Sequence, residues 1–423
     1  MQFLDENHVV VALSSQRKFE GNGDPYNHLY IPARGAPLAA VLPHATIVLP
    51  ENPEIRELIR FLEKTLVSTL RGQMRVVWVS GKNYLLDDDI TAEARNKLGE
   101  IVLSHQDQGR STVVLPYCRS APFTAWSDHL AASQYSVIGD APAFIEAYGT
   151  KQILYPDVAD DSSKGLFAGL PISLPRGFFC RSIADLPAAY DRLVAEGIVD
   201  VVVKPTASAA GLGIAKVRSR AELFAYNWHL GGSFVVEECL SVDHDQDGCE
   251  VSCSVQFIGD QIVGLPKSQL VNGSHWEGNV SPGLFNKEFG EQVLGQARHA
   301  LKKLRELGMQ GPGGFDFLST KGKPYLVDPN LGRFTGAHWP DFIAQRLIPN
   351  RPWAALEFPQ HRDIFEVWEI LKQNGLALDL AKGEGGFPFC HLRNMWSMAL
   401  AFAPTNELAF ATIKKARAIL RQC

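Results

Sequence analysis

The strongest constraint on the fold is a pair of short apolar segments joined by a Lys-Gly turn, which predicts a β-hairpin within residues 314–328. If the turn centres on Gly322, Asp316 lies directly opposite Asp328, and Asn330 shares their face of the sheet. Two carboxylates this close repel unless a cation lies between them or one is protonated. Three hard oxygen donors suit Mg²⁺ that also contacts phosphate oxygens. Two surface acids flanking a turn are the alternative, but they explain less well why both interrupt apolar strands.

Residues 201–203 form an apolar strand that ends in Lys204, and a loop without bulky side chains follows at 206–213. A lysine at the end of a buried strand, together with backbone N–H groups of such a loop, can bind phosphate oxygens. Protein kinases have their glycine-rich loop before the strand lysine, and the chain has no G-x-x-x-x-G-K-[S/T] sequence, so both classes are excluded. A plain hairpin turn is the alternative for residues 211–213.

A third strand, within residues 234–240, ends in two acids and a leucine. Glu237 and the backbone of residues 238–240 could contact an adenine, although such a strand end is ordinary when taken alone. The acidic segment 243–248 matches the first half of a calcium loop, but the required glutamate at position 12 is Ser254. A solvated loop is therefore favoured there.

The composition excludes several classes of protein. The chain has 423 residues, of which 46% are hydrophobic, and its net charge of −5 argues against binding to nucleic acid through phosphate neutralisation. No apolar run reaches the ~18 residues of a membrane span, and Asp5 and Glu6 stand where a signal peptide would be basic. Seven scattered cysteines without a C-x-x-C pair favour free thiols. We therefore expect a cytoplasmic protein that binds neither nucleic acid nor membrane.

The N-terminal part alternates between strand and helix patterns. Residues 8–13, 45–49, 75–79 and 112–115 are short apolar runs of strand type, and residues 54–70 have helical spacing of apolar side chains. Strands interleaved with helices predict a parallel α/β sheet.

In chain order, the strand lysine, the small-residue loop, the E-E-x-L strand end and the D-F-L…D-P-N…R segment resemble the ATP-grasp family over residues 130–340. This resemblance implies a fold that holds ATP between two α+β subdomains, with two Mg²⁺ ions as cofactors. It implies phosphate binding by Lys151, Lys204, Ser208, Gly211, Gly213 and Lys267. It implies adenine and ribose contacts from Glu237, Glu238, Leu240 and Glu250. It further implies Asp316, Asp328 and Asn330 as metal ligands, with Lys204 and Arg333 as catalytic residues.

Residues 70–80 and 148–151, the latter followed by Gly-Leu-Pro at 169–171, are similar to ligases with a preATP-grasp domain, such as the pheganomycin-type peptide ligase.

That resemblance implies a Rossmann-like preATP-grasp domain at 1–130 and an ATP-grasp domain at 131–345. ATP would lie between the subdomains 131–231 and 232–345. Residues 346–423 would form a C-terminal extension packed on the ATP-grasp core.

The activity implied is ATP-dependent ligation of a carboxylate to an amine through an acylphosphate, with release of ADP and phosphate. The substrates would be small molecules, an amino acid or a small peptide in specialised metabolism, and a homodimer is left open. An ATP-dependent phosphotransferase on the same scaffold and a nucleotide-binding regulatory protein without turnover are the alternatives, because function depends on the acceptor site rather than on the fold.

Overall fold

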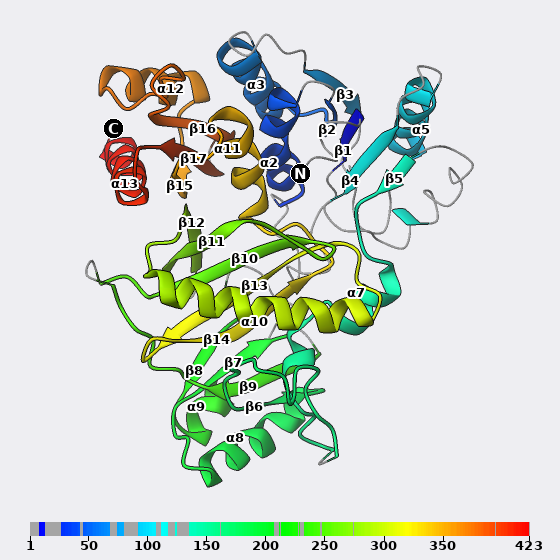
Figure 1. The fold of residues 1–423 in the computed structure, drawn as a ribbon, viewed down its shortest axis with the longest axis vertical. Coiled ribbons are helices and arrows are strands. Elements are labelled where there is room, and N and C mark those ends of the chain that lie inside the picture. The colour runs from blue at the N-terminus through cyan, green and yellow to red at the C-terminus, as the bar shows by residue number, and fades with distance from the viewer. Residues whose placement is uncertain are drawn as a thin grey trace.

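The structure, a computed structural model, describes residues 8–12, 27–42, 45–67, 74–79, 92–106, 111–116, 123–124, 135–160, 162–206, 211, 213–226, 228, 232–245, 248–273, 275–393 and 395–422. Their strands form sheets of five, eight and four strands. The five-stranded sheet lies at the top of Figure 1 and the four-stranded sheet at the bottom, with much of the eight-stranded sheet between them.

The five-stranded sheet has the order β3-β2-β1-β4-β5, and every pairing in it is parallel. Its strands are β1 (His8–Ala12), β2 (Ala45–Pro50), β3 (Arg75–Val79), β4 (Thr112–Pro116) and β5 (Tyr135–Val137). The accompanying helices are α2 (Asn27–Val41), α3 (Pro53–Leu62) and α5 (Ala92–Gln106), with a π-helical turn, η1 (Glu63–Val67), after α3. The Asn52 side chain caps α3 by accepting the N–H groups of Glu54 and Ile55. The predicted parallel α/β sheet is confirmed.

The four-stranded sheet is antiparallel and has the order β6-β9-β7-β8. Its elements are β6 (Gly177–Cys180), β7 (Val201–Pro205), β8 (Ala215–Val217), β9 (Phe234–Glu238), α8 (Leu186–Ala195), α9 (Arg220–Ala225) and the 3-10 turn η3 (Ile183–Asp185). Val201, Val203 and Val236 pack in one apolar cluster with α8. Since strand side chains alternate, Lys204 and Glu237 lie on the opposite face.

The eight-stranded sheet is also antiparallel and has the order β14-β13-β10-β11-β12-β15-β17-β16. Its strands are β10 (Ser252–Ile258), β11 (Gln261–Asn272), β12 (His275–Ser281), β13 (Pro312–Thr320), β14 (Lys323–Leu331), β15 (Trp353–Gln360), β16 (Gly385–His391) and β17 (Met395–Phe402). The C-terminal strands therefore extend the sheet that contains the predicted hairpin, and the division of the chain into domains stays a prediction.

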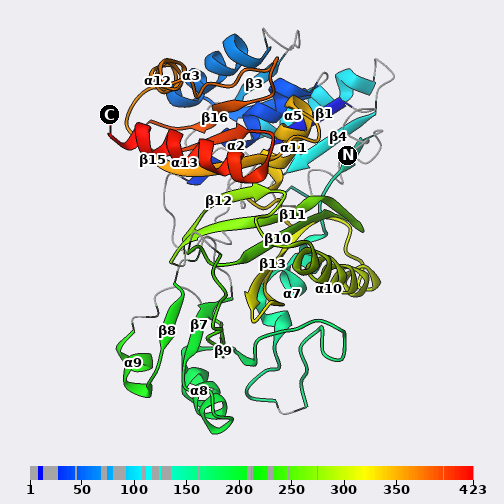
Figure 2. The same cartoon turned by 60° about the vertical axis from the view of Figure 1, so that its left-hand side comes forward.

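Helices cover both faces of this sheet. They are α10 (Lys287–Glu306), α11 (His338–Leu347), α12 (Ile364–Gln373) and α13 (Asn406–Gln422), and α7 (Pro142–Tyr148) and the 3-10 turn η2 (Lys151–Leu154) lead into the four-stranded sheet. Helix α10 packs on one face together with Phe315 and Phe317 of β13. On the other face, α11 contacts α2. Figure 2 shows that α10 and α13 lie apart from each other along the sheet.

The predicted hairpin is β13–β14, and its turn residues Lys321 and Gly322 both have positive φ angles, 53° and 72°. This conformation suits the two-residue turn of a twisted hairpin. The carboxylate of Asp243 accepts the N–H groups of both turn residues and the hydroxyl of Ser319. Asp243 thus stabilises the turn, which agrees with the rejection of the calcium-loop pattern.

The five described cysteines are free thiols. Among the described residues, no helix combines the length and the apolar character that a bilayer span requires.

Candidate active site

The register of the hairpin brings the two predicted metal-binding aspartates together. Asp316 is paired directly with Asp328, and Gly314 is paired with Asn330. A β-bulge follows Asp316 in this pairing. Because the neighbouring Phe315 and Phe317 belong to the core under α10, Asp316 faces the opposite side of the sheet. The predicted opposition of the two aspartates is confirmed.

Asp316 is held by hydrogen bonds from two sides. Ser254 Oγ donates to Oδ1 at 2.8 Å, and Asn330 Nδ2 donates to Oδ2 at 2.9 Å. Arg333 Nη2 donates in turn to Asn330 Oδ1 at 2.6 Å. Burial, with a smaller contribution from the charge of Asp328, raises the pKa of Asp316 to about 7. This carboxyl group therefore lies where a nearby positive charge would favour its ionised form.

Asp328 pairs with Lys151, whose Nζ lies 3.0 Å from Oδ2. Lys151 is 3% exposed, at the start of η2. The other oxygen of Asp328, Oδ1, is buried and has no hydrogen-bond partner among the described residues. A raised carboxyl pKa beside an unpartnered carboxylate oxygen fits a cation between the two aspartates.

A second group projects from the four-stranded sheet. Lys204 Nζ lies 2.5 Å from Glu237 Oε1, and the hydroxyl of Tyr155 donates to Glu237 Oε2 at 2.7 Å. Burial raises the pKa of Tyr155 well above its usual value, and the charges of Glu237 and Asp328 add to this. Lys151 contacts Asp328, and Tyr155, four positions later, contacts Glu237, so residues 151–155 bring the two groups of residues close together. No sequence pattern predicted a role for Tyr155, which is 82 positions from Glu237.

The other predicted nucleotide contacts lie near the end of β9 or in the loop after β7. Glu238 pairs with Arg176 at 3.1 Å, and Leu240 and Glu250 are half-buried. Gly211 and Gly213 have positive φ angles of 80° and 73°. Ser208 lies outside the described residues.

Lys267 of β11 is paired with Ser254 of β10, the residue that donates to Asp316. Its side chain is fully buried, with Nζ 3.6 Å from Asp341 Oδ2 of α11 and hydrogen-bonded to the carbonyl of Leu265 at 3.0 Å. Asp341 is itself 0% exposed. Moving Lys267 to a phosphate would leave a buried carboxylate without its cation, which is strongly unfavourable. The expectation that Lys267 binds phosphate stays a prediction, and in this structure Lys267 is the partner of Asp341.

Comparison with known proteins places this geometry in a known fold. Residues 182–337 match the ATP-grasp domain family. The whole chain is similar to N5-carboxyaminoimidazole ribonucleotide synthetase solved with ADP, with a TM-score of 0.57 and 14% identity over 99% of this chain and 97% of that one. It is also similar to carboxyaminoimidazole ribonucleotide synthase from Aspergillus clavatus solved with ATP, with a TM-score of 0.55 and 12% identity over 99% of both chains.

Biotin carboxylase from Campylobacter jejuni has a TM-score of 0.56 and 13% identity, over 98% of this chain and 92% of that one. No curated protein matches the chain in sequence. Identities this low establish the fold and leave substrates undetermined. The chain therefore has the ATP-grasp fold over almost its whole length.

Proposed function

We propose that the protein is an ATP-dependent ligase that activates a carboxylate as an acylphosphate and transfers the acyl group to an amine. The observation that carries this proposal is the facing pair Asp316–Asp328 on one sheet, with Lys151 beside it and Lys204 on the sheet opposite. Two lysines and two carboxylates that converge between two sheets are suited to a triphosphate with its metal ions. We also propose that the protein is similar to the pheganomycin-type peptide ligase and that it consists of the three domains 1–130, 131–345 and 346–423.

Both lysines are now paired with acids, Lys151 with Asp328 and Lys204 with Glu237. On ATP binding, the phosphates would join the carboxylates as partners of both ammonium groups, so that neither acid is left without a cation. The backbone N–H groups of Glu238 and Cys239 are already bonded to the carbonyls of Arg176 and Asp200. The adenine would therefore be recognised by the backbone at Leu240 and by carbonyl groups of this strand end, with Glu250 toward the ribose.

Asp316, Asp328 and Asn330 would hold Mg²⁺. The buried, unpartnered oxygen of Asp328 and the raised pKa of Asp316 fit this role. Bound there, Mg²⁺ would supply positive charge that offsets the charge of the β- and γ-phosphates.

The reaction would proceed in two steps. An oxygen of the substrate carboxylate attacks the γ-phosphorus, and the bond to ADP breaks, while Lys151 and Lys204 hold the phosphate oxygens in line. The amine nitrogen then attacks the acyl carbon. The carbon–oxygen bond to phosphate breaks, phosphate leaves with the electron pair, and it takes the proton lost by nitrogen. Arg333, 6% exposed and anchored on Asn330, would stabilise the tetrahedral oxyanion.

The proposal is tested by ATP turnover with Mg²⁺ over a panel of amino acids, peptides and other carboxylates, with hydroxylamine as the nucleophile. Formation of ADP together with a hydroxamate is the expected result, and it would identify the activated acid. ADP with a phosphorylated acceptor and no hydroxamate would instead support the phosphotransferase. ATP binding without turnover across the panel would support a regulatory protein and contradict the ligase.

A further inference from the structure

Residues from four separate parts of the chain meet on the face of the eight-stranded sheet that is opposite to α10. They are Arg34 of α2, Trp276 of β12, Gly336 in the segment that follows Arg333, and Glu357 of β15. We refer to Arg34, Trp276, Gly336 and Glu357 as the Arg34 cluster. The proposed nucleotide site uses none of these residues.

The contacts of the cluster centre on the Arg34 guanidinium. The Cζ atom of Arg34 lies 5.4 Å from the Trp276 ring centroid, and Nη2 of Arg34 lies 3.6 Å from Glu357 Oε2. A Cβ added at Gly336 would lie 3.4 Å from Arg34 Nη1 and 2.9 Å from the Trp276 ring. The backbone three residues after Arg333 therefore reaches both the cation and the indole.

The cluster shares its face of the sheet with the aspartates. Ser254 is paired with both Asp316 and Lys267, and Gln269 lies two residues after Lys267. Gln269 is paired with Asn279, and Asn279 is paired with Ala355, two residues before Glu357. Paired residues share a face, as do residues two apart in one strand. Strand β12 is three strands from β13 in the sheet order, or about 14 Å. An amino acid spans only part of this distance, and the acyl group carried by the phosphate would span the rest.

Two buried amide oxygens lie on the same face, in strands between β13 and β15. Asn279 Oδ1 and Gln256 Oε1 have no hydrogen-bond partner among the described residues, and both side chains are 0% exposed. Buried acceptors are nearly always paired with a donor. The N–H groups of an amine bound above the sheet would provide donors for them.

The charges favour one kind of ligand. The Arg34 and Glu357 side chains are only 12% and 8% exposed, and the two charged groups lie 3.6 Å apart. An arginine in such surroundings recognises the two oxygens of a carboxylate. A phosphate would bring a second negative charge close to Glu357, so the single charge of a carboxylate is preferred.

We propose that the Arg34 cluster and Asn279 bind the amine substrate of the ligase, and that this substrate is an amino acid or peptide whose own carboxylate is held by Arg34. The inference rests on the proposed function, because it needs an acylphosphate for the amine to attack. With its carboxylate on Arg34, the substrate directs its amine toward Arg333 and the aspartates. Glu357 is a positioning residue that orients the guanidinium. The amide product keeps a free carboxylate.

The test compares matched nucleophiles with and without a carboxylate: alanine against ethylamine, and phenylalanine against 2-phenylethylamine. The acid is the one identified by hydroxamate formation. The variants are Arg34→Gln and Arg34→Lys, and Arg56→Gln is the matched control, since Arg56 forms an exposed pair with Glu51. A hydrogen bond between charged groups corresponds to about tenfold or more in kcat/KM.

We expect the wild type to favour at least one amino acid over its matched amine by about tenfold or more in kcat/KM. Arg34→Gln should remove most of this preference by raising the KM of the amino acid, with little effect on the matched amine. Arg34→Lys, which keeps a cation, should retain part of it and tests the same point if Arg34→Gln does not fold. Arg56→Gln should match the wild type.

Equal use of the amino acids and their matched amines by the wild type, or a preference that survives in both Arg34 variants, would overturn the inference and leave Arg34–Glu357 as a structural ion pair. In either case hydroxamate formation by the wild type would keep the proposed function intact. Absence of hydroxamate from the wild type would remove both.

Discussion

The protein contains two kinds of buried lysine–carboxylate pair, and they differ in what surrounds them. Lys204–Glu237 and Lys151–Asp328 lie on facing surfaces of two sheets, and the Asp328 side chain remains 24% exposed. Lys267–Asp341 lies inside the protein, with exposures of 0% and 1%. A lysine of the first kind can add a phosphate as a further partner, whereas both members of the second kind are enclosed by protein. Surroundings, more than residue type, separate a candidate binding lysine from a structural one.

The largest effect should come from Asp328→Asn. The substitution removes one of the two facing charges and the partner of Lys151, so ADP formation should fall by at least about a hundredfold. The melting temperature should stay near that of the wild type, because the asparagine oxygen can still accept a hydrogen bond from Lys151 and the repulsion with Asp316 is removed.

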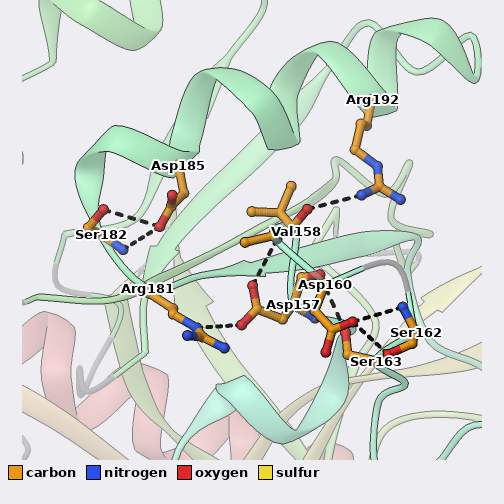
Figure 3. A network of polar contacts seen from close by, with 10 residues as sticks. Asp157, Val158, Asp160, Ser162, Ser163, Arg181, Ser182, Asp185 and Arg192 are labelled. Atoms are coloured by element: carbon orange, nitrogen blue, oxygen red, sulfur yellow. Dashed lines mark hydrogen bonds and ion pairs between the residues drawn. The ribbon is translucent and has the colours of Figure 1, made fainter.

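Asp160→Asn is the matched control for Asp328→Asn. Asp160 lies in an exposed loop, where its carboxylate accepts hydrogen bonds from the backbone N–H and the hydroxyl of Ser162 (Figure 3). Comparable loss of ADP formation in both variants, or full activity in Asp328→Asn, would contradict the assignment of Asp328.

Lys204 and Glu237 form the ion pair that faces the proposed nucleotide. Lys204→Met should abolish turnover and lower the free energy of unfolding by about 3–5 kcal/mol, because Glu237 is left buried without a cation. The double variant Lys204→Met/Glu237→Gln should regain most of that stability in chemical denaturation while turnover stays lost. Restored turnover in the double variant would remove Lys204 from the site.

The buried pair should behave in the opposite way. Lys267→Met should lower the free energy of unfolding by about 3–5 kcal/mol, since Asp341 then has no cation beside it. Lys267→Met/Asp341→Asn should recover both stability and turnover, the latter to within about twofold. A double variant that is stable but inactive would show that Lys267 does take part in the reaction.

The smallest effect should come from Asp243→Ala, which removes the acceptor for the hairpin turn and should cost about 1 kcal/mol near neutral pH. The hydrogen bonds from Gly322 and Ser319 hold the pKa of Asp243 below its usual 3.8. A depressed folded-state pKa gives stability that is present above pH 3.8 and is lost as pH falls through the folded value. The difference between wild type and variant in unfolding experiments should shrink over that acidic range, and a constant difference would contradict this role.

The parts of the site that could be predicted from the sequence are local. The Lys-Gly turn sets the hairpin register, and that register alone places Asp316 opposite Asp328. Lys204 could be identified because it ends an apolar strand before a loop of small residues. Both are properties of segments shorter than about twenty residues, so no knowledge of the tertiary packing is needed.

The parts that could not be predicted depend on contacts between distant segments. Tyr155 and Ser254 are bonded to acids 82 and 62 positions away. The environment of Lys267 is set by α11 covering the sheet, which strand patterns do not reveal. Arg34 meets Glu357 only because α2 packs beside the eight-stranded sheet. The order of motifs along the chain therefore does not predict which lysine side chains face the candidate site.

The proposed acylphosphate is tested most directly by isotope labelling of the substrate carboxylate. The acid identified by hydroxamate formation is labelled with ¹⁸O in its carboxylate and incubated with ATP, Mg²⁺ and an amine, and the released phosphate is analysed by mass spectrometry. Attack of the carboxylate on the γ-phosphorus, followed by cleavage of the carbon–oxygen bond, predicts one ¹⁸O atom in each phosphate. Unlabelled phosphate formed together with the amide would contradict an acylphosphate and the role given to the facing aspartates.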